Sequence, residues 1–140
     1  KDIKEINKNF RFQQIISKDA IINSNVFVDE GTLIISGAII NTGTKIGKHC
    51  IINTSCSIDH DNKFSDFSST GPGVITGGDV EVGRQSYLGL GCLVRHKVKI
   101  LDNTIVGFGS LVNKNCKKNS IYWGSPVKRI RTRKYNEDYL

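Results

Sequence analysis

The sequence of 140 residues lacks several features that would assign it to particular protein classes. No apolar run approaches the ~20 residues of a transmembrane helix, and no secretory signal pattern is present. We therefore expect a cytoplasmic protein without a membrane span. The sequence also contains no Met and begins with Lys1. A translation product starts with Met, so we expect the tail of a longer protein or a processed form.

The chain has fewer acidic than basic residues, 13 against 20, and its net charge is +7. Much of the excess lies near the end of the chain, at Lys114, Lys117, Lys118, Lys128, Arg129, Arg131, Arg133 and Lys134. Such a field attracts a phosphorylated ligand, although a solvated, solubilising end is the alternative. No nucleic-acid-binding module or aromatic-interleaved surface accompanies the charge, so we expect no nucleic-acid partner.

The chain contains a six-residue repeat in which two positions never carry a charged residue. Every sixth residue from Ile22 to Val112 is uncharged, and nearly all are large and apolar. A second uncharged column, two residues earlier in each hexad, holds mostly small or β-branched residues from Ala20 to Cys116. Because 24% of the chain is charged, both columns must face an interior. A period of this kind outranks local propensity as a guide to the fold.

The hexad predicts a parallel β-helix. Its two inward positions alternate with outward ones, as in a short strand, and glycines at hexad ends suit tight turns. Three hexads make a triangular coil of eighteen residues, and coils stack at about 4.8 Å. We place a lead-in at residues 1–19, the β-helix at residues 20–116, and a loop and basic tail at residues 117–140.

The two ends depart from the repeat. In the lead-in, Ile3, Ile6 and Phe10 have rough helical spacing. The open first coil could be covered by Phe10, Phe12, Ile15 and Ile16, as a solenoid end requires. At the other end, a turn at residues 122–128 precedes the basic tail, for which we expect a short helix.

Cysteines occur only in the small inward column, at Cys50, Cys56, Cys92 and Cys116. Cys56 and Cys92 share a side but lie two coils apart, roughly 10 Å, which is too far for a disulfide. No CxxC pair exists. We predict packing roles in a reducing compartment.

Histidines are few, namely His49, His60 and His96. His60 is flanked by Asp59 and Asp61 at a corner of the coil. A neighbouring carboxylate can hold one imidazole tautomer and stabilise the cation formed when the ring takes a proton. Locally, an ordinary surface histidine is equally compatible with this pattern.

The coil length gives His60 a context. Steps of eighteen residues lead from His60 to Gly78, His96 and Lys114, which predicts a vertical column along one edge with spacings of about 4.8 Å. A long ligand would suit this column, which offers a general base, the unshielded backbone of a glycine, a second histidine and a lysine. Its reactive end would lie at His60 and its phosphorylated end near Lys114.

Four motifs carry a resemblance to a known family: NTSCSIDHD at 53–61, FSDFSSTGPG at 64–73, EVGRQSYLGLG at 81–91 and WGSPVKRI at 123–130. From about residue 10 to residue 131 the chain resembles the hexapeptide-repeat sugar acetyltransferases that modify sialic acids or nucleotide-linked 4-amino sugars. The resemblance implies a left-handed β-helix, acetyl-CoA as co-substrate without a metal, and a homotrimer with active sites between subunits.

The resemblance also implies roles for individual residues. His60 falls on the catalytic base, Asp61 on its acidic neighbour and Asp59 on a supporting carboxylate. Asn53 matches the residue that helps place the acceptor, and Gly78 the backbone N–H that faces the thioester carbonyl. We expect the remaining contacts with acetyl-CoA to come from Ser69, Leu90, His96, Lys114 and Lys128.

Three departures from the family pattern stand out. Ser69 replaces a histidine that often contacts acetyl-CoA, and Val127 replaces an alanine in the closing loop. Relatives also carry an N-terminal nucleotide-sugar-binding domain, of which residues 1–19 resemble only the exit segment.

The main prediction is N-acetylation of a nucleotide-linked 4-amino sugar in the synthesis of a bacterial surface glycan, with O-acetylation of a sialic acid as the alternative. Two other classes stay open. One is an inactive trimeric binding scaffold. The other is a zinc lyase of carbonic-anhydrase type, which needs three histidines around one metal, whereas His60 and His96 are expected roughly 10 Å apart.

Overall fold

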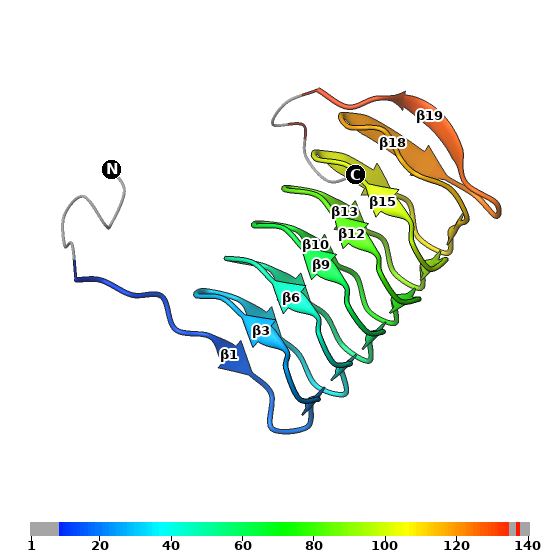
Figure 1. Cartoon of the computed structure of the whole chain (residues 1–140). Helices are drawn as coiled ribbons and strands as arrows, with labels where there is room; N and C mark the ends of the chain where they lie inside the picture. Colours follow the sequence, from blue (N-terminus) through cyan, green and yellow to red (C-terminus); the bar gives the residue numbers. More distant parts are fainter. Residues whose placement is uncertain (1–8, 135–136, 138–140) are drawn as a thin grey trace.

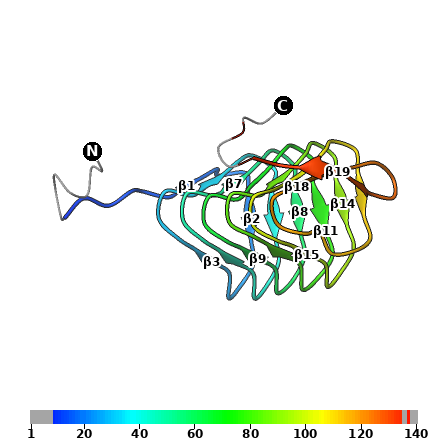
Figure 2. The same ribbon diagram turned by 90° about the horizontal axis from the view of Figure 1, so that it is seen from above.

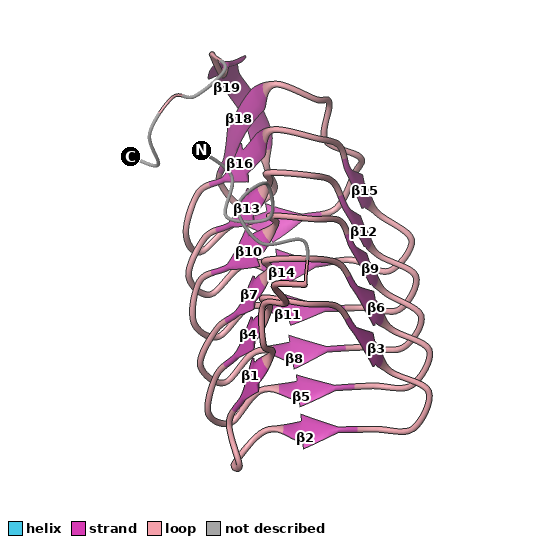
Figure 3. Cartoon of the chain, turned by 90° about the vertical axis from the view of Figure 1, so that its left-hand side faces the viewer, coloured by secondary structure: helices cyan, strands magenta, loops and turns pink. Residues whose placement is uncertain are grey.

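The computed structural model describes residues 9–134 and 137. This part of the chain forms a left-handed parallel β-helix and contains no α-helix (Figure 1). The coils stack into a three-sided prism whose walls are three sheets (Figure 3). Seen from above, successive coils follow the same outline (Figure 2). The β-helix predicted from the hexads is therefore confirmed.

Up to β17, each wall takes every third strand. The first sheet contains β1 (Ile15–Ile16), β4 (Leu33–Ile34), β7 (Ile51–Ile52), β10 (Ser69–Thr70), β13 (Tyr87–Leu88), β16 (Thr104–Val106), β18 (Ser120–Trp123) and β19 (Lys128–Thr132). The second sheet contains β2 (Ile21–Ile22), β5 (Ile39–Ile40), β8 (Ser57–Ile58), β11 (Ile75–Thr76), β14 (Leu93–Val94) and β17 (Leu111–Val112). The third sheet contains β3 (Phe27–Val28), β6 (Lys45–Ile46), β9 (Lys63–Phe64), β12 (Glu81–Val82) and β15 (Lys99–Ile100).

The strand register repeats at eighteen residues. Ser57 pairs with Ile75, and Ile75 in turn pairs with Leu93. The coil predicted from the sequence is thus the coil of the molecule. We call the turns from the first to the second sheet the first corner, those from the second to the third sheet the second corner, and those from the third back to the first the third corner.

The core consists of the two inward columns. From Thr32 onward their residues are buried, and Phe64 is the largest side chain among them. Thr70 and Thr76 stand where large apolar residues are the rule, and their hydroxyls accept the N–H groups of Asn53 and Asp59 at 3.0 and 3.3 Å. The Thr-containing coil therefore keeps the register of its neighbours, because its polar atoms are satisfied inside the prism.

Both ends differ from the regular coils. Strand β1 already pairs with β4 at Ile15, so stacking begins before residue 20. Phe12 packs against His49 at the third corner, with ring centroids 4.7 Å apart. Of the predicted cap residues, Ile15 and Ile16 form β1 and are exposed. Ile3 and Ile6, which gave the predicted helical spacing, lie outside the described residues.

At the far end, the expectation of a short helix is wrong for Lys128–Thr132. This segment forms β19, which pairs antiparallel with β18. Strand β18 itself continues the first sheet by pairing in parallel with β16. The other edge of β18 would present unpaired backbone groups, and β19 supplies their partners.

All four cysteines are free and buried, as predicted. Burial raises the pKa of the Cys116 thiol to about 12 and raises the pKa values of Cys50 and Cys92 as well. Thiols held in the protonated form are poor nucleophiles. Their role is therefore to fill the narrow inward column.

Candidate active site

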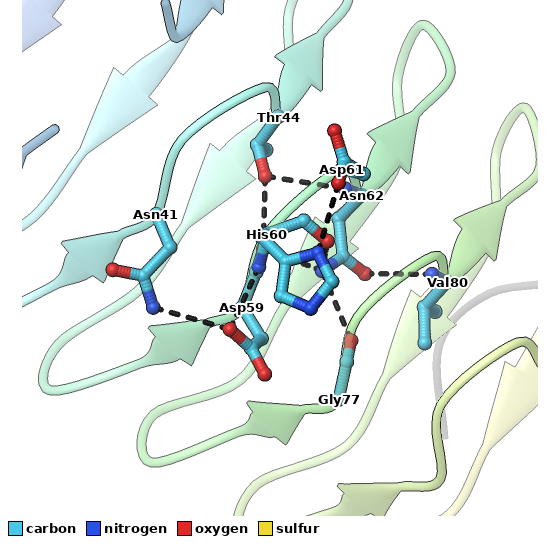
Figure 4. Close-up of polar contacts among 8 residues, drawn as sticks. All are labelled: Asn41, Thr44, Asp59, His60, Asp61, Asn62, Gly77 and Val80. Carbon is cyan, nitrogen blue, oxygen red and sulfur yellow. Dashed lines mark hydrogen bonds and ion pairs between the residues drawn. The ribbon is translucent and has the colours of Figure 1, made fainter. Parts of the chain in front are cut away.

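His60 lies at the second corner, in the turn between β8 and β9. The next residue, Asp61, has a left-handed backbone with φ of 57°. Asp61 Oδ2 lies 2.8 Å from His60 Nδ1 (Figure 4). With a proton on Nδ1 donated to this carboxylate, the lone pair of the neutral ring lies on Nε2, which is the arrangement of a base.

The electrostatics of the turn favour the protonated ring. The hydrogen bond that His60 makes to the Asp61 carboxylate is the main cause of a raised pKa for His60. Desolvation opposes it, and the charges of Asp59, Asp61 and Asp79 add to it. The two side chains remain accessible, with 51% of His60 and 59% of Asp61 exposed. An incoming ligand can therefore reach the imidazole.

Asp59 supports the turn rather than the ring. Its Oδ1 accepts the backbone N–H of His60 at 2.8 Å and the side-chain amide of Asn41 at 3.4 Å. The carboxylate thereby holds the main chain from which the imidazole projects. This contact suits the supporting role that the sequence predicts for Asp59.

Gly78 lies directly against the imidazole. A Cβ added at Gly78 would stand 2.5 Å from both Nε2 and Cε1 of His60. The backbone of Gly78 is not left-handed, so glycine is needed here for space and not for conformation. The predicted neighbours His60 and Gly78 are thus in contact.

The column continues into the next coil. Lys97 N–H donates to Gly78 O at 2.9 Å, and a Cβ on Gly77 would stand 2.8 Å from the backbone N of His96. His96 and Lys114 are both exposed. Lys114 lies in a turn two residues shorter than the others, since Val112 pairs with Val94 but Cys116 bridges to Ile100.

Three predicted site residues lie apart from this column. Asn53, Ser69 and Leu90 occupy the first corner or the strand leading to it, with Leu90 55% exposed between two glycines. The first and second corners are the opposite margins of the second sheet. Within one chain, the second sheet therefore separates these three residues from the column of His60. Lys128 begins β19 at the far end of the stack.

A hollow of about 550 Å³ adjoins the second corner. Its lining includes Asp61, Asn62, Lys63, Asp79 and Glu81, but not His60. It borders the candidate site without containing the imidazole.

One residue of the site escaped the sequence analysis as a functional candidate. Asn62 is the only amide side chain in the small inward column, and the structure leaves it 1% exposed. A buried amide needs partners for both of its hydrogens and for its oxygen. An amide in a column that faces the interior was thus the feature of the sequence that could have pointed to Asn62. In the structure, its hydrogen-bond partners belong to the turns of His60 and Gly78.

A zinc site would need several ligating side chains around one point. Among residues 9–134 and 137, no three His, Cys, Asp or Glu side chains are grouped in this way. The three-histidine site of the lyase alternative is thus not formed within this part of the chain. In the same residues, no helix is long and apolar enough to cross a membrane.

No family model matches the chain, but solved structures do. A variant of perosamine N-acetyltransferase from Caulobacter crescentus, in complex with CoA and GDP-perosamine, is 30% identical, with a TM-score of 0.88 over 92% of this chain and 61% of that chain. PerB from the same organism, in complex with CoA and GDP-perosamine, is 31% identical, with a TM-score of 0.88 over 92% and 62%. The acetyltransferase domain of PglB from Neisseria gonorrhoeae is 22% identical, with a TM-score of 0.86 over 91% and 63%, a likeness that supports the fold alone.

The fold thus places the chain among the hexapeptide-repeat left-handed β-helix proteins. More narrowly, a sugar acetyltransferase, the perosamine N-acetyltransferase, is among its structural neighbours, which confirms the resemblance predicted from the four motifs. The chain spans about 61% of the length of the perosamine N-acetyltransferase.

Proposed function

We propose that the chain is the β-helix part of an acetyl-CoA-dependent sugar acetyltransferase, and that its acceptor is the amine of a nucleotide-linked 4-amino sugar. The observation that carries this proposal is the His60–Asp61 pair lying against the backbone of Gly78. Two solved structures at 30–31% identity contain CoA and GDP-perosamine, which supports both the donor and the class of acceptor.

The proposed reaction is direct transfer. The amine nitrogen attacks the thioester carbonyl of acetyl-CoA, and Nε2 of His60 removes a proton from that nitrogen. Asp61 stabilises the imidazolium, and the N–H of Gly78 donates to the developing oxyanion, a contact typically worth about 3 kcal/mol of barrier. Collapse of the tetrahedral intermediate breaks the C–S bond, and the imidazolium returns the proton to the CoA sulfur.

We also propose a homotrimer with active sites between subunits. The outer face of the second sheet supports this assembly, since its exposed residues are mainly apolar: Ile21, Ile39, Ile75, Leu93 and Leu111. The outer face of the third sheet is instead mainly charged, with Lys45, Lys63, Glu81 and Lys99. A second chain against the apolar face would bring its own corners to the margins of that face. Sedimentation velocity measures the assembly.

Such packing would complete the cofactor path. Acetyl-CoA would run past His96 of one chain and Leu90 and Ser69 of another, with its phosphates near Lys114 or Lys128. Ser69 can donate a hydrogen bond through its hydroxyl, but it cannot take up a proton as histidine does.

The decisive experiment measures CoA release with acetyl-CoA and a panel of acceptors. We expect turnover with a nucleotide-linked 4-amino sugar and little with the same sugar lacking the amine. Preferred turnover of a sialic acid would replace N-acetylation by O-acetylation. Binding of CoA with no turnover of any acceptor would favour an inactive scaffold.

The pH dependence of kcat/KM tests the base. Because His60 must be neutral to accept a proton and its pKa is raised, activity should rise with pH through a midpoint above the ordinary histidine value of about 6.5. Replacing Asp61 with Asn removes the main cause of the shift. The midpoint should move down and the plateau should fall by roughly 10- to 100-fold. An unchanged midpoint in Asp61→Asn would contradict the pairing.

The raised pKa of His60 also predicts how the stability of the fold depends on pH. A raised folded pKa stabilises the chain fully at pH below the unfolded value, and this contribution is lost as pH rises through the folded pKa. Thermal melts of wild type and Asp61→Asn should therefore differ more at acidic than at alkaline pH.

A further inference from the structure

The buried amide of Asn62 joins the two halves of the proposed site (Figure 4). From its Nδ2, hydrogen bonds run to the backbone oxygens of Asp59 at 2.6 Å, His60 at 3.3 Å and Gly77 at 3.0 Å. Its Oδ1 accepts the N–H of Val80 at 3.1 Å. One side chain, 1% exposed, thus holds the turn that carries the imidazole and the turn that carries Gly78.

The contact with Gly77 O orients the proposed oxyanion donor. Gly77 C=O and Gly78 N–H belong to one planar trans peptide, so they point in opposite directions. Because the carbonyl is directed at the buried Asn62, the N–H of Gly78 is directed away from the core. Among the described residues, no hydrogen bond is recorded for this N–H, which leaves it available to a ligand.

Other residues of the small inward column also make hydrogen bonds to the backbone of the next coil, and we call this pair of bonds the vertical tie. Thr32 donates to Gly47 O, fifteen residues ahead, at 2.7 Å and accepts Cys50 N–H, eighteen ahead, at 3.0 Å. Ser86 does the same with Leu101 O and Thr104 N–H, at 2.9 and 3.0 Å. A hydroxyl has one hydrogen and makes only this vertical tie. Asn62 has two amide hydrogens, and the second holds its own turn.

We propose that Asn62 is a positioning residue that sets the imidazole of His60 relative to the N–H of Gly78. This inference rests on the proposed function, in which these two groups act on the same thioester. Asn62 touches neither reactant. It acts through the carbonyls of Asp59, His60 and Gly77, and thereby fixes the base and the oxyanion donor as one rigid unit before substrate arrives.

The fold offers matched substitutions for a test. Valine occupies the same column at Val80 and Val98, so Asn62→Val should fit the prism while removing every bond of the amide. Asn62→Thr should keep the vertical tie in the form that Thr32 uses and lose the hold on the His60 turn. Ser86→Ala breaks an equivalent tie at the third corner and reports the cost to the fold alone.

The measurements are kcat, KM for acetyl-CoA, thermal stability and the His60 pKa by NMR of the imidazole. In Asn62→Val we expect kcat at least ~10-fold lower with KM little changed, and a His60 pKa that falls toward the ordinary value of about 6.5 because the contact with Asp61 is less populated. Asn62→Thr should recover part of the rate, and Ser86→Ala should lose thermal stability while keeping kcat.

Other results would overturn the inference. A kcat for Asn62→Val within about twofold of wild type would do so, as would an equal loss in Ser86→Ala, since that would be a purely structural effect. If the wild type transfers no acetyl group, the proposed function fails on its own account. The NMR pKa then still decides whether Asn62 positions the ring, because an unchanged pKa in Asn62→Val rejects it.

Discussion

Replacing His60 with Ala is expected to lower kcat for acetyl transfer at least ~100-fold, the usual scale for loss of a general base. The side chain is half exposed and packs into no part of the core, so the fold and assembly should be retained. The measurement is initial-rate CoA release at a pH above the midpoint of the wild-type profile, beside a thermal melt and sedimentation velocity.

A suitable control removes a different imidazole. His49 lies at the third corner, stacked against Phe67 with ring centroids 5.1 Å apart. Glutamine fits the backbone there, because Gln85 stands in the same column with φ of 56°, close to the 54° of His49. The His49→Gln variant should keep its rate. A His60→Ala variant with near-normal rate would remove His60 from the mechanism.

Replacing Gly78 with Ala is expected to cost about 100-fold in kcat, the scale of a displacement of about 1 Å in a reacting group. The new Cβ would stand 2.5 Å from Nε2 of His60, so the exposed ring must swing away and leave its alignment with the Gly78 N–H. The backbone N–H itself is retained, and no left-handed strain arises. Thermal stability should therefore change little.

A double-mutant cycle of Gly78→Ala with His60→Ala distinguishes displacement of the imidazole from other causes of a lower kcat. If Gly78→Ala acts by moving the imidazole, it should cost little more once His60 is already Ala, because the two residues are directly coupled. Additive losses would instead mean that the substitution blocks the thioester or acceptor independently of the base.

The sequence predicted the fold well because burial on the inner wall tolerates no charge. The uncharged columns from Ile22 and Ala20 gave both the coil length and the register, and the steps of eighteen placed Gly78 next to His60 and His96 one coil further. The positions of corner residues thus follow from counting, since each coil repeats the one below it.

Other features depend on side-chain directions and on unrepeated segments, which a period does not describe. The contact between His60 and Asp61 forms in a turn where the backbone of Asp61 is left-handed. The role of Asn62 depends on which carbonyls its amide meets. Strand β19 forms because β18 exposes an edge, and the charge of Lys128–Thr132 gives no sign of this pairing.

The eighteen-residue register also constrains how this protein can change in length. A segment of six residues inserted between His60 and Gly78 would carry the glycine one third of the way around the prism, onto another corner and out of reach of the imidazole. A whole extra coil inserted elsewhere would only make the prism taller. Insertions that spare catalysis should therefore either come in multiples of eighteen or bulge outward from a corner as loops.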